Sequence, residues 1–126
     1  MPLMSKYISI ENRNRGIAGS LKIKYCDNFL TQLRGFTFHP KLMLDEGLVL
    51  VGTHDSRLES SIHMLFVSFD LFVIWINSDM RVVDNIIAKS WRPAYFSKQP
   101  AKYVLEVHPD RWEEFQIGDT VQFKNA

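Results

Sequence analysis

The stretch that decides the fold runs from residue 60 to residue 84 and reads SSIHMLFVSFDLFVIWINSDMRVVD. Between residues 62 and 76, apolar side chains occupy both alternating positions of any strand drawn through the sequence. This pattern is typical of a strand that is buried on both faces. Because strands are most often about 5–6 residues long, we expect a bend near Ser68 and two central strands, at 61–67 and 70–76.

Asp70 interrupts this apolar run. A bilayer-spanning helix needs roughly 20 apolar residues, and a carboxylate near its middle is costly, so we interpret the run as a core segment. A buried carboxylate costs several kcal/mol unless it is paired or hydrogen-bonded. We therefore expect Asp70 to be buried with a partner, and the sequence offers Arg34, His63 or backbone amide groups.

Length and composition limit the class of protein. The chain has 126 residues, which fits a single domain spanning 1–126. Its 15 Lys and Arg against 14 Asp and Glu give a net charge of +1, so no global field attracts nucleic acid or a membrane. The single cysteine, Cys26, excludes an internal disulfide and is compatible with a reducing compartment. Since the N-terminus lacks the apolar core of a signal peptide, we expect a cytoplasmic protein.

The N-terminal part of the chain is locally basic. Five Lys and Arg against Glu11 leave residues 1–26 with a charge of +4, which is five minus one. Two alternating segments flank the sequence NRNRGIAG, whose Asn and Gly residues accept positive φ, and this predicts a hairpin over 5–25. Arg13 and Arg15 lie at its tip. Contact of this hairpin with nucleic acid is a weaker alternative function, with salt-dependent binding as its signature.

The remaining elements predict a mainly β (α+β) fold. We expect a compact single-domain β-barrel or sandwich-like sheet with one or two short helices. The helices are expected at 27–34, where Asp27 is a good N-cap, and at 109–115, where Pro109 suits the first turn. Further strands are expected at 48–51, 82–88, 103–107 and 119–123.

A long connection rich in aromatic residues follows the strand at 82–88. It contains Trp91, Pro93, Tyr95, Phe96 and Pro100. We expect it to pack over the sheet, and a lid or binding edge is the alternative.

Five segments in a fixed order resemble one known family. They are RGFTFHPKL, EGLVLV, IHMLFVSFDLFVIWIN, AKYVLEV and QIGDTVQF, and together they are similar to the domain of unknown function 192 family over residues 25–123. This resemblance implies a compact, mostly β domain with a short helix or two and without a settled biochemical activity. The positions that match the family pattern are Arg34, Gly35, Gly47, Asp70, Glu106, Gly118 and Asp119.

His63 and three departures distinguish this sequence within the resemblance. His63 fits a subgroup with an I-H-T-F-F type of strand. Thr37 replaces the usual Met, Ser68 the usual Pro before the aspartate, and Met80 the usual Gly in the following turn. The first change would alter a pocket wall, and the other two would alter the turns on either side of the Asp70 strand.

The sequence contains none of the strong catalytic signatures. It has no nucleophile-elbow glycines, phosphate loop, dinucleotide fingerprint or zinc-ligand spacing, and we expect neither a cofactor nor a metal. Whether the protein is an enzyme stays open, with the interpretation leaning towards a non-catalytic module.

The candidate site comprises Arg34, His63, Asp70 and Glu106, which are ionisable residues carried in apolar surroundings. Our first hypothesis is a binding or interaction module that uses these residues to bind a small polar or anionic ligand. The alternative is a small enzyme in which His63 works as general acid or base and Asp70 orients it. Neither hypothesis involves a membrane, and nucleic acid is not the expected partner.

Overall fold

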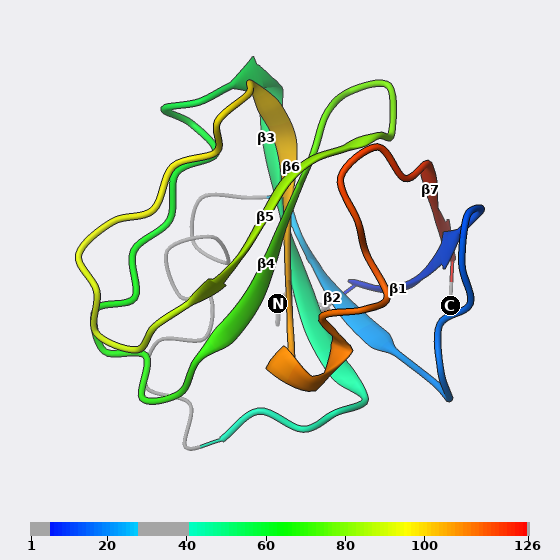
Figure 1. The fold of residues 1–126 in the computed structure, drawn as a ribbon, viewed down its shortest axis with the longest axis horizontal. Coiled ribbons are helices and arrows are strands. Elements are labelled where there is room, and N and C mark those ends of the chain that lie inside the picture. The colour runs from blue at the N-terminus through cyan, green and yellow to red at the C-terminus, as the bar shows by residue number, and fades with distance from the viewer. Residues whose placement is uncertain (1–5, 28–40, 126) are drawn as a thin grey trace, which may run out of the picture.

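The computed structural model describes residues 6–27 and 41–125. They form one seven-stranded sheet with the order β5-β4-β6-β3-β2-β1-β7 (Figure 1). Neighbouring strands are antiparallel, except that β2 and β3 are parallel. The strands are β1 (Lys6–Asn12), β2 (Lys22–Cys26), β3 (Glu46–Ser56), β4 (Leu71–Ile76), β5 (Val82–Ala88), β6 (Ala101–Val107) and β7 (Val121–Asn125).

The sheet curls until its two edges meet at one end. The Val82 N–H donates to the Asp119 carbonyl at 2.9 Å, and the Gly118 N–H donates back to the Val82 carbonyl at 2.8 Å. Strands β5 and β7 nevertheless remain the two edges of the sheet. The mainly β class and the sandwich-like sheet are therefore confirmed, whereas the closed barrel is wrong.

Strand β4 is buried on both faces, as its sequence predicts. Each of its six residues is buried, because β4 lies between β5 and β6 and core clusters cover both sides of it. Phe72, Ile74 and Ile76 pack inside the curl together with residues of β1, β6 and β7. Val73 and Trp75 pack on the opposite face. The strand expected at 70–76 is confirmed, and it begins at Leu71.

Two long loops cover the second face of the sheet. They are residues 57–70 and 89–100, which run together at the left of Figure 1. Ile62 and Tyr95 exchange backbone hydrogen bonds of 3.0 and 2.9 Å between the loops. The strand expected at 61–67 is wrong, since Ile62 forms an isolated bridge and the remaining residues are a turn at 65–66 and irregular backbone. The expectation that the aromatic connection packs over the sheet is supported by Tyr95, which packs against the second core cluster.

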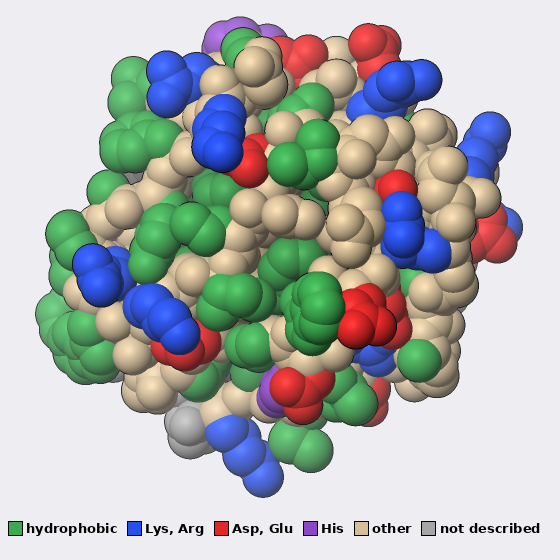
Figure 2. All heavy atoms as spheres, in the orientation of Figure 1, with side chains coloured by type: hydrophobic (Ala, Val, Ile, Leu, Met, Phe, Trp, Pro, Cys, Tyr) green, Lys and Arg blue, Asp and Glu red, His purple; other side chains and the backbone are tan. Residues whose placement is uncertain are grey.

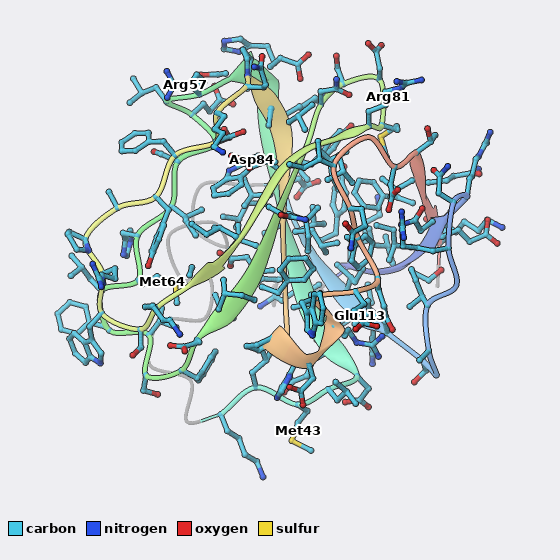
Figure 3. All side chains as sticks on the ribbon, in the orientation of Figure 1. Met43, Arg57, Met64, Arg81, Asp84 and Glu113 are labelled. Carbon is cyan, nitrogen blue, oxygen red and sulfur yellow. The ribbon has the colours of Figure 1, made fainter. Side chains whose placement is uncertain are left out.

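The ends of these loops are fixed by polar side chains. Arg57 donates from Nε to the Ser97 carbonyl at 2.8 Å, and the buried carboxylate of Asp84 accepts a 2.9 Å hydrogen bond from the Lys98 N–H. Figure 3 labels Arg57 and Asp84 beside the upper part of the loops. Met64, also labelled there, has no exposed surface and belongs to the second core cluster.

The expected short helices are not confirmed. The helix at 27–34 lies outside the described residues except for Asp27. In place of a helix over 109–115 there is a single 3₁₀ turn, η1 (Pro109–Arg111), with proline in its first turn. The Arg111 side chain, at the end of this turn, bonds the distant carbonyl groups of Leu44 and Ala18. Within the described residues, no helix is long and apolar enough to cross a membrane.

Candidate functional site

We call residues 62–66 and 89–95, where the two covering loops meet, the loop apex. Met64 joins the loops twice: its N–H donates to the Arg92 carbonyl at 2.9 Å, and its carbonyl accepts from the Trp91 N–H at 2.9 Å. The Tyr95 hydroxyl accepts a 2.8 Å hydrogen bond from the Lys89 N–H. These contacts hold the two loops in one fixed arrangement.

An exposed aromatic pair occupies the tip of the loop apex. The rings of Phe66 and Trp91 meet edge to face, with centroids 5.3 Å apart, although their residues remain 49% and 54% exposed. Both have left-handed backbone, with φ of 62° and 65°, and such a conformation costs on the order of 1–3 kcal/mol for a residue other than glycine. Figure 2 shows hydrophobic side chains gathered at the left margin, on the side where the loops lie.

His63 lies in the loop apex and points away from the sheet. Its neighbours Ile62 and Met64 are buried, whereas His63 is exposed. No residue in the described part of the chain hydrogen-bonds its ring. The ring is therefore accessible to a ligand.

Asp70 is close to the loop apex but is not buried, which corrects the expectation from the sequence. Its side chain is 37% exposed. Oδ1 accepts a 3.0 Å hydrogen bond from the Ser90 N–H, and Oδ2 lies 3.3 Å from Lys89 Nζ. The Ser90 amide, assisted by Lys89, holds the pKa of Asp70 below its ordinary value. Of the partners that the sequence offers, a backbone amide is the one observed. No hydrogen bond joins His63 to Asp70 in the described structure, and Arg34 lies outside the described residues.

Among the candidate site residues that the structure describes, Glu106 is the one that is buried. It lies on the inner strand β6, between Leu48 of β3 and Val73 of β4, and is 5% exposed. Burial among these apolar neighbours raises the pKa of Glu106 to about 8. No hydrogen bond in the described structure joins Glu106 to His63 or Asp70. These three predicted residues therefore do not form one hydrogen-bonded site.

Sequence reasoning missed the strongest polar cluster, which surrounds Asp119. This carboxylate is 4% exposed and accepts from Arg15 Nε at 2.6 Å and Nη2 at 2.8 Å. Asn12 Nδ2 donates at 2.7 Å and the Gln116 N–H at 2.8 Å. Arg15 first, and then Asn12 and the Gln116 amide, lower the pKa of Asp119 to about 2. The basic residues of the hairpin tip were visible in the sequence. No residue nearby in the sequence indicated that Asp119 is the acidic partner.

A hollow of about 450 Å³ lies beside this cluster, within the connection from β1 to β2. Arg13 and Arg15 belong to its lining, and Ile10 and Leu21 contribute apolar surface. Among the described residues, no group of His, Cys, Asp and Glu could hold a metal ion.

The fold and these sites define a class: a small, mainly β domain with one curled, open sheet and two long loops across its outer face. Over residues 10–123 the chain matches the DUF192 family, described as "Uncharacterized ACR", and it belongs to that family. The resemblance inferred from five sequence segments is thereby confirmed, and the match extends further towards the N-terminus.

Relatives of the chain carry no named activity. A UPF0127 protein of Thermococcus kodakarensis is 37% identical over 116 residues, which are 90% of this chain and 72% of that protein. A UPF0127 protein of Pyrococcus furiosus is 33% identical over 96 residues, covering 75% of this chain and 78% of that protein. The names of these relatives state no function, so we infer the function from the structure.

Solved structures share the fold at low sequence identity. A protein of unknown function from Novosphingobium aromaticivorans aligns with a TM-score of 0.73 and 18% identity, over 94% of this chain and 83% of that one. A protein from Sinorhizobium meliloti aligns with a TM-score of 0.79 and 15% identity, over 95% and 94% of the two chains. These likenesses show a shared architecture alone.

Proposed function

We propose that the protein is a non-catalytic binding module whose loop apex binds an anionic ligand that also carries an aromatic or apolar group. The observation that carries this proposal is the Phe66–Trp91 pair. Exposing two large aromatic side chains forfeits the stabilisation of burying them, and left-handed backbone adds strain. Aromatic side chains held in place at a surface are typical anchors of binding sites.

The charges around the aromatic pair favour an anion. His63, Lys89 and Arg92 lie in the loop apex, and Asp70 is the acidic group that neutralises Lys89. Arg92 is exposed, and no carboxylate in the described residues pairs with it. An anionic group on the ligand would meet Arg92 while its apolar part covers the rings.

The two alternatives gain no supporting contact. In the enzyme alternative Asp70 would orient His63, but its carboxylate is engaged by Ser90 and Lys89. In the nucleic-acid alternative the basic hairpin would bind phosphates. However, Arg15 is paired with Asp119, and Lys22 Nζ lies over the Tyr7 ring at 4.3 Å.

The test uses 8-anilinonaphthalene-1-sulfonate, a fluorescent dye that combines an anionic sulfonate with aromatic rings. We expect native protein to bind the dye, and Trp91→Ala to bind it about tenfold more weakly, as for loss of an aromatic anchor. Trp112→Ala is the matched control, since Trp112 is 55% exposed but lies next to η1. Equal losses in the two variants would show non-specific adsorption and contradict the proposal.

A glycine substitution separates binding from folding. Phe66→Gly removes the ring and relieves the positive φ, which glycine adopts without strain. We expect the melting temperature to stay the same or rise while dye binding weakens. A large fall in melting temperature would mean that the aromatic pair stabilises the loops and is not held for a ligand.

A further inference from the structure

Strand β1 has neighbours on both sides for only part of its length. It pairs with β7 from Ile8 to Asn12, but with β2 only from Lys6 to Ile8. Beyond Ile8 the strand keeps only its β7 neighbour, and after Asn12 the chain leaves the sheet and returns through Leu21. This connection stands away from the sheet at the right of Figure 1. An inner strand of the sheet therefore has an open edge over its last residues.

The register shows which backbone groups face the gap. The Arg13 N–H donates to the Thr120 carbonyl, on the β7 side. In an antiparallel strand, successive residues direct their backbone groups to opposite sides, so Ile10 and Asn12 direct theirs away from β7. Within the described chain, no residue across the gap bonds to these backbone groups. Ile10 is only 7% exposed, and an unsatisfied backbone group near a core is costly.

The gap is the hollow described above, and the fold holds it open. Arg111 is 4% exposed and donates to the Ala18 carbonyl at 3.1 Å and the Ser20 carbonyl at 3.2 Å. Arg15, bonded twice to Asp119, fixes the other part of the connection. With these anchors in place, the connection cannot collapse onto β1 to complete the ladder.

We propose that this hollow binds a short extended peptide, which pairs with the Ile10–Asn12 edge of β1 and directs an acidic group to Arg13. Alternating backbone donors and acceptors on an open strand edge are what an added strand requires. At about 3.3 Å per residue, a segment of about three to four residues matches the open length. Arg13 is exposed and lines the hollow. Its Nη2 donates to Gln122 Oε1 at 3.3 Å, and no carboxylate among the described residues pairs with it.

The size of the hollow argues against other occupants. A volume of about 450 Å³, bounded by the connection at 13–21, admits a short segment but not the edge of another folded sheet. A simple anion would satisfy Arg13, but it would leave the Ile10 and Asn12 backbone groups without partners. The extended peptide accounts for the charge and for the strand edge together.

The probe is a fluorescently labelled library of N-acetylated tetrapeptides with Asp at one position and random residues elsewhere. We expect saturable binding by fluorescence polarisation, and loss of binding when alternate peptide nitrogens are methylated, since methylation removes the pairing N–H groups. Absence of saturable binding, or equal binding of the methylated library, would overturn the proposal. Competition by sodium acetate as effective as by unlabelled peptide would also overturn it, because a carboxylate alone would then suffice.

A pair of tryptophan substitutions maps the binding to the hollow. Gly16 lines it, and a Cβ added there meets nothing within 4 Å, so Gly16→Trp should fill the hollow without disturbing the backbone. Ala18→Trp is the matched control, because Ala18 is exposed on the same connection but does not line the hollow. We expect about tenfold weaker peptide binding in the first variant, as for an interface hot spot, and unchanged binding in the second.

Amide hydrogen exchange supplies a readout in the unaltered protein, should Gly16→Trp fail to fold. The Ile10 and Asn12 N–H groups should exchange faster than that of Arg13 in the free protein. Excess peptide library should slow them by about tenfold or more, which corresponds to about 1.4 kcal/mol. Exchange rates that do not change on peptide addition would overturn the proposal.

Discussion

Glu106 and Asp119 are two carboxylates with almost the same burial and opposite behaviour. Their residues are 5% and 4% exposed, yet the pKa of Glu106 is raised to about 8 and that of Asp119 is lowered to about 2. Glu106 is flanked by apolar side chains, whereas Asp119 accepts hydrogen bonds from Arg15, Asn12 and Gln116. Burial therefore sets how large the pKa shift can be, and the hydrogen-bonding partners decide which protonation state the fold stabilises.

The two residues also give stability opposite dependences on pH. For Glu106 the folded state binds its proton more tightly, so stability is highest below pH 4.5 and falls as the pH rises towards 8. For Asp119 the folded state binds the proton less tightly, so stability is present above pH 3.8 and is lost as the pH falls towards 2. Substitutions can test each half of this comparison separately.

The largest effect is expected for Glu106→Gln in alkaline solution. Glutamine imitates the neutral acid, so the variant should match the wild type near pH 4. Near pH 9 it should be more stable by on the order of 4 kcal/mol, because the wild type must then ionise a buried group. Urea denaturation across this pH range measures the difference. Parallel pH profiles for the two proteins would mean that Glu106 reaches solvent.

Asp119→Ala should rank second. Removing one partner of a buried pair costs about 3–5 kcal/mol, and the partial exposure of Arg15 places this case near 3. Urea denaturation at pH 7 checks the value. Glu11→Gln is the control, since the Glu11–Lys124 pair is exposed and should contribute less than about 1 kcal/mol. A similar small loss in both variants would show that the cluster is not a buried pair.

A smaller effect is expected from Arg15→Gln in acid. In the wild type, the shift at Asp119 should remove about 2 kcal/mol of stability as the pH falls from about 4 to 2. Without the guanidinium the pKa of Asp119 rises, so this part of the acid dependence should shrink. Thermal unfolding at several acidic pH values follows it. An unchanged acid profile would assign the low pKa to Asn12 and the Gln116 amide instead.

The smallest effect is expected for Asp70→Asn. Its carboxylate is 37% exposed, so solvent screens its interaction with Lys89, and the loss should be less than about 1 kcal/mol. Differential scanning calorimetry at low and high salt measures it. A loss of stability as large as that of Asp119→Ala would contradict this expectation. It would show that the exposure of Asp70 does not make its contribution smaller than that of the buried Asp119.

The apolar run at 60–84 shows how far local pattern predicts the fold. Residues 71–76 form a strand because their apolar side chains fill both faces of a central position in the sheet. Residues 61–67 have a similar composition, but they form a loop that covers the sheet, with Phe66 exposed. Composition reports that a segment contacts the core; it does not report whether its backbone pairs with neighbours in the sheet or crosses over them.

The candidate site was predicted less well than the strands. The sequence places His63 among apolar residues, whereas its exposure depends on the turn that follows. Asp70 was expected inside because its neighbours in sequence are apolar, and the bend at the start of β4 leaves it half-exposed instead. Two exposed rings on left-handed backbone have no sequence signature, since φ at Phe66 and Trp91 is imposed by contacts between the loops.

By itself the sequence determined the β class, the family, and the central strand, expected at 70–76 and observed at 71–76, because apolar runs and ordered motifs are local properties. Tertiary structure alone decided which buried carboxylate is charged and where β1 lacks a neighbour. Arg15 and Asp119 are 104 positions apart, and the connection beside the open edge at Ile10 is bonded by the distant Arg111. Such partners are set by how the sheet curls, and ionisation and hydrogen bonding depend on atoms within a few ångströms rather than on neighbours along the chain.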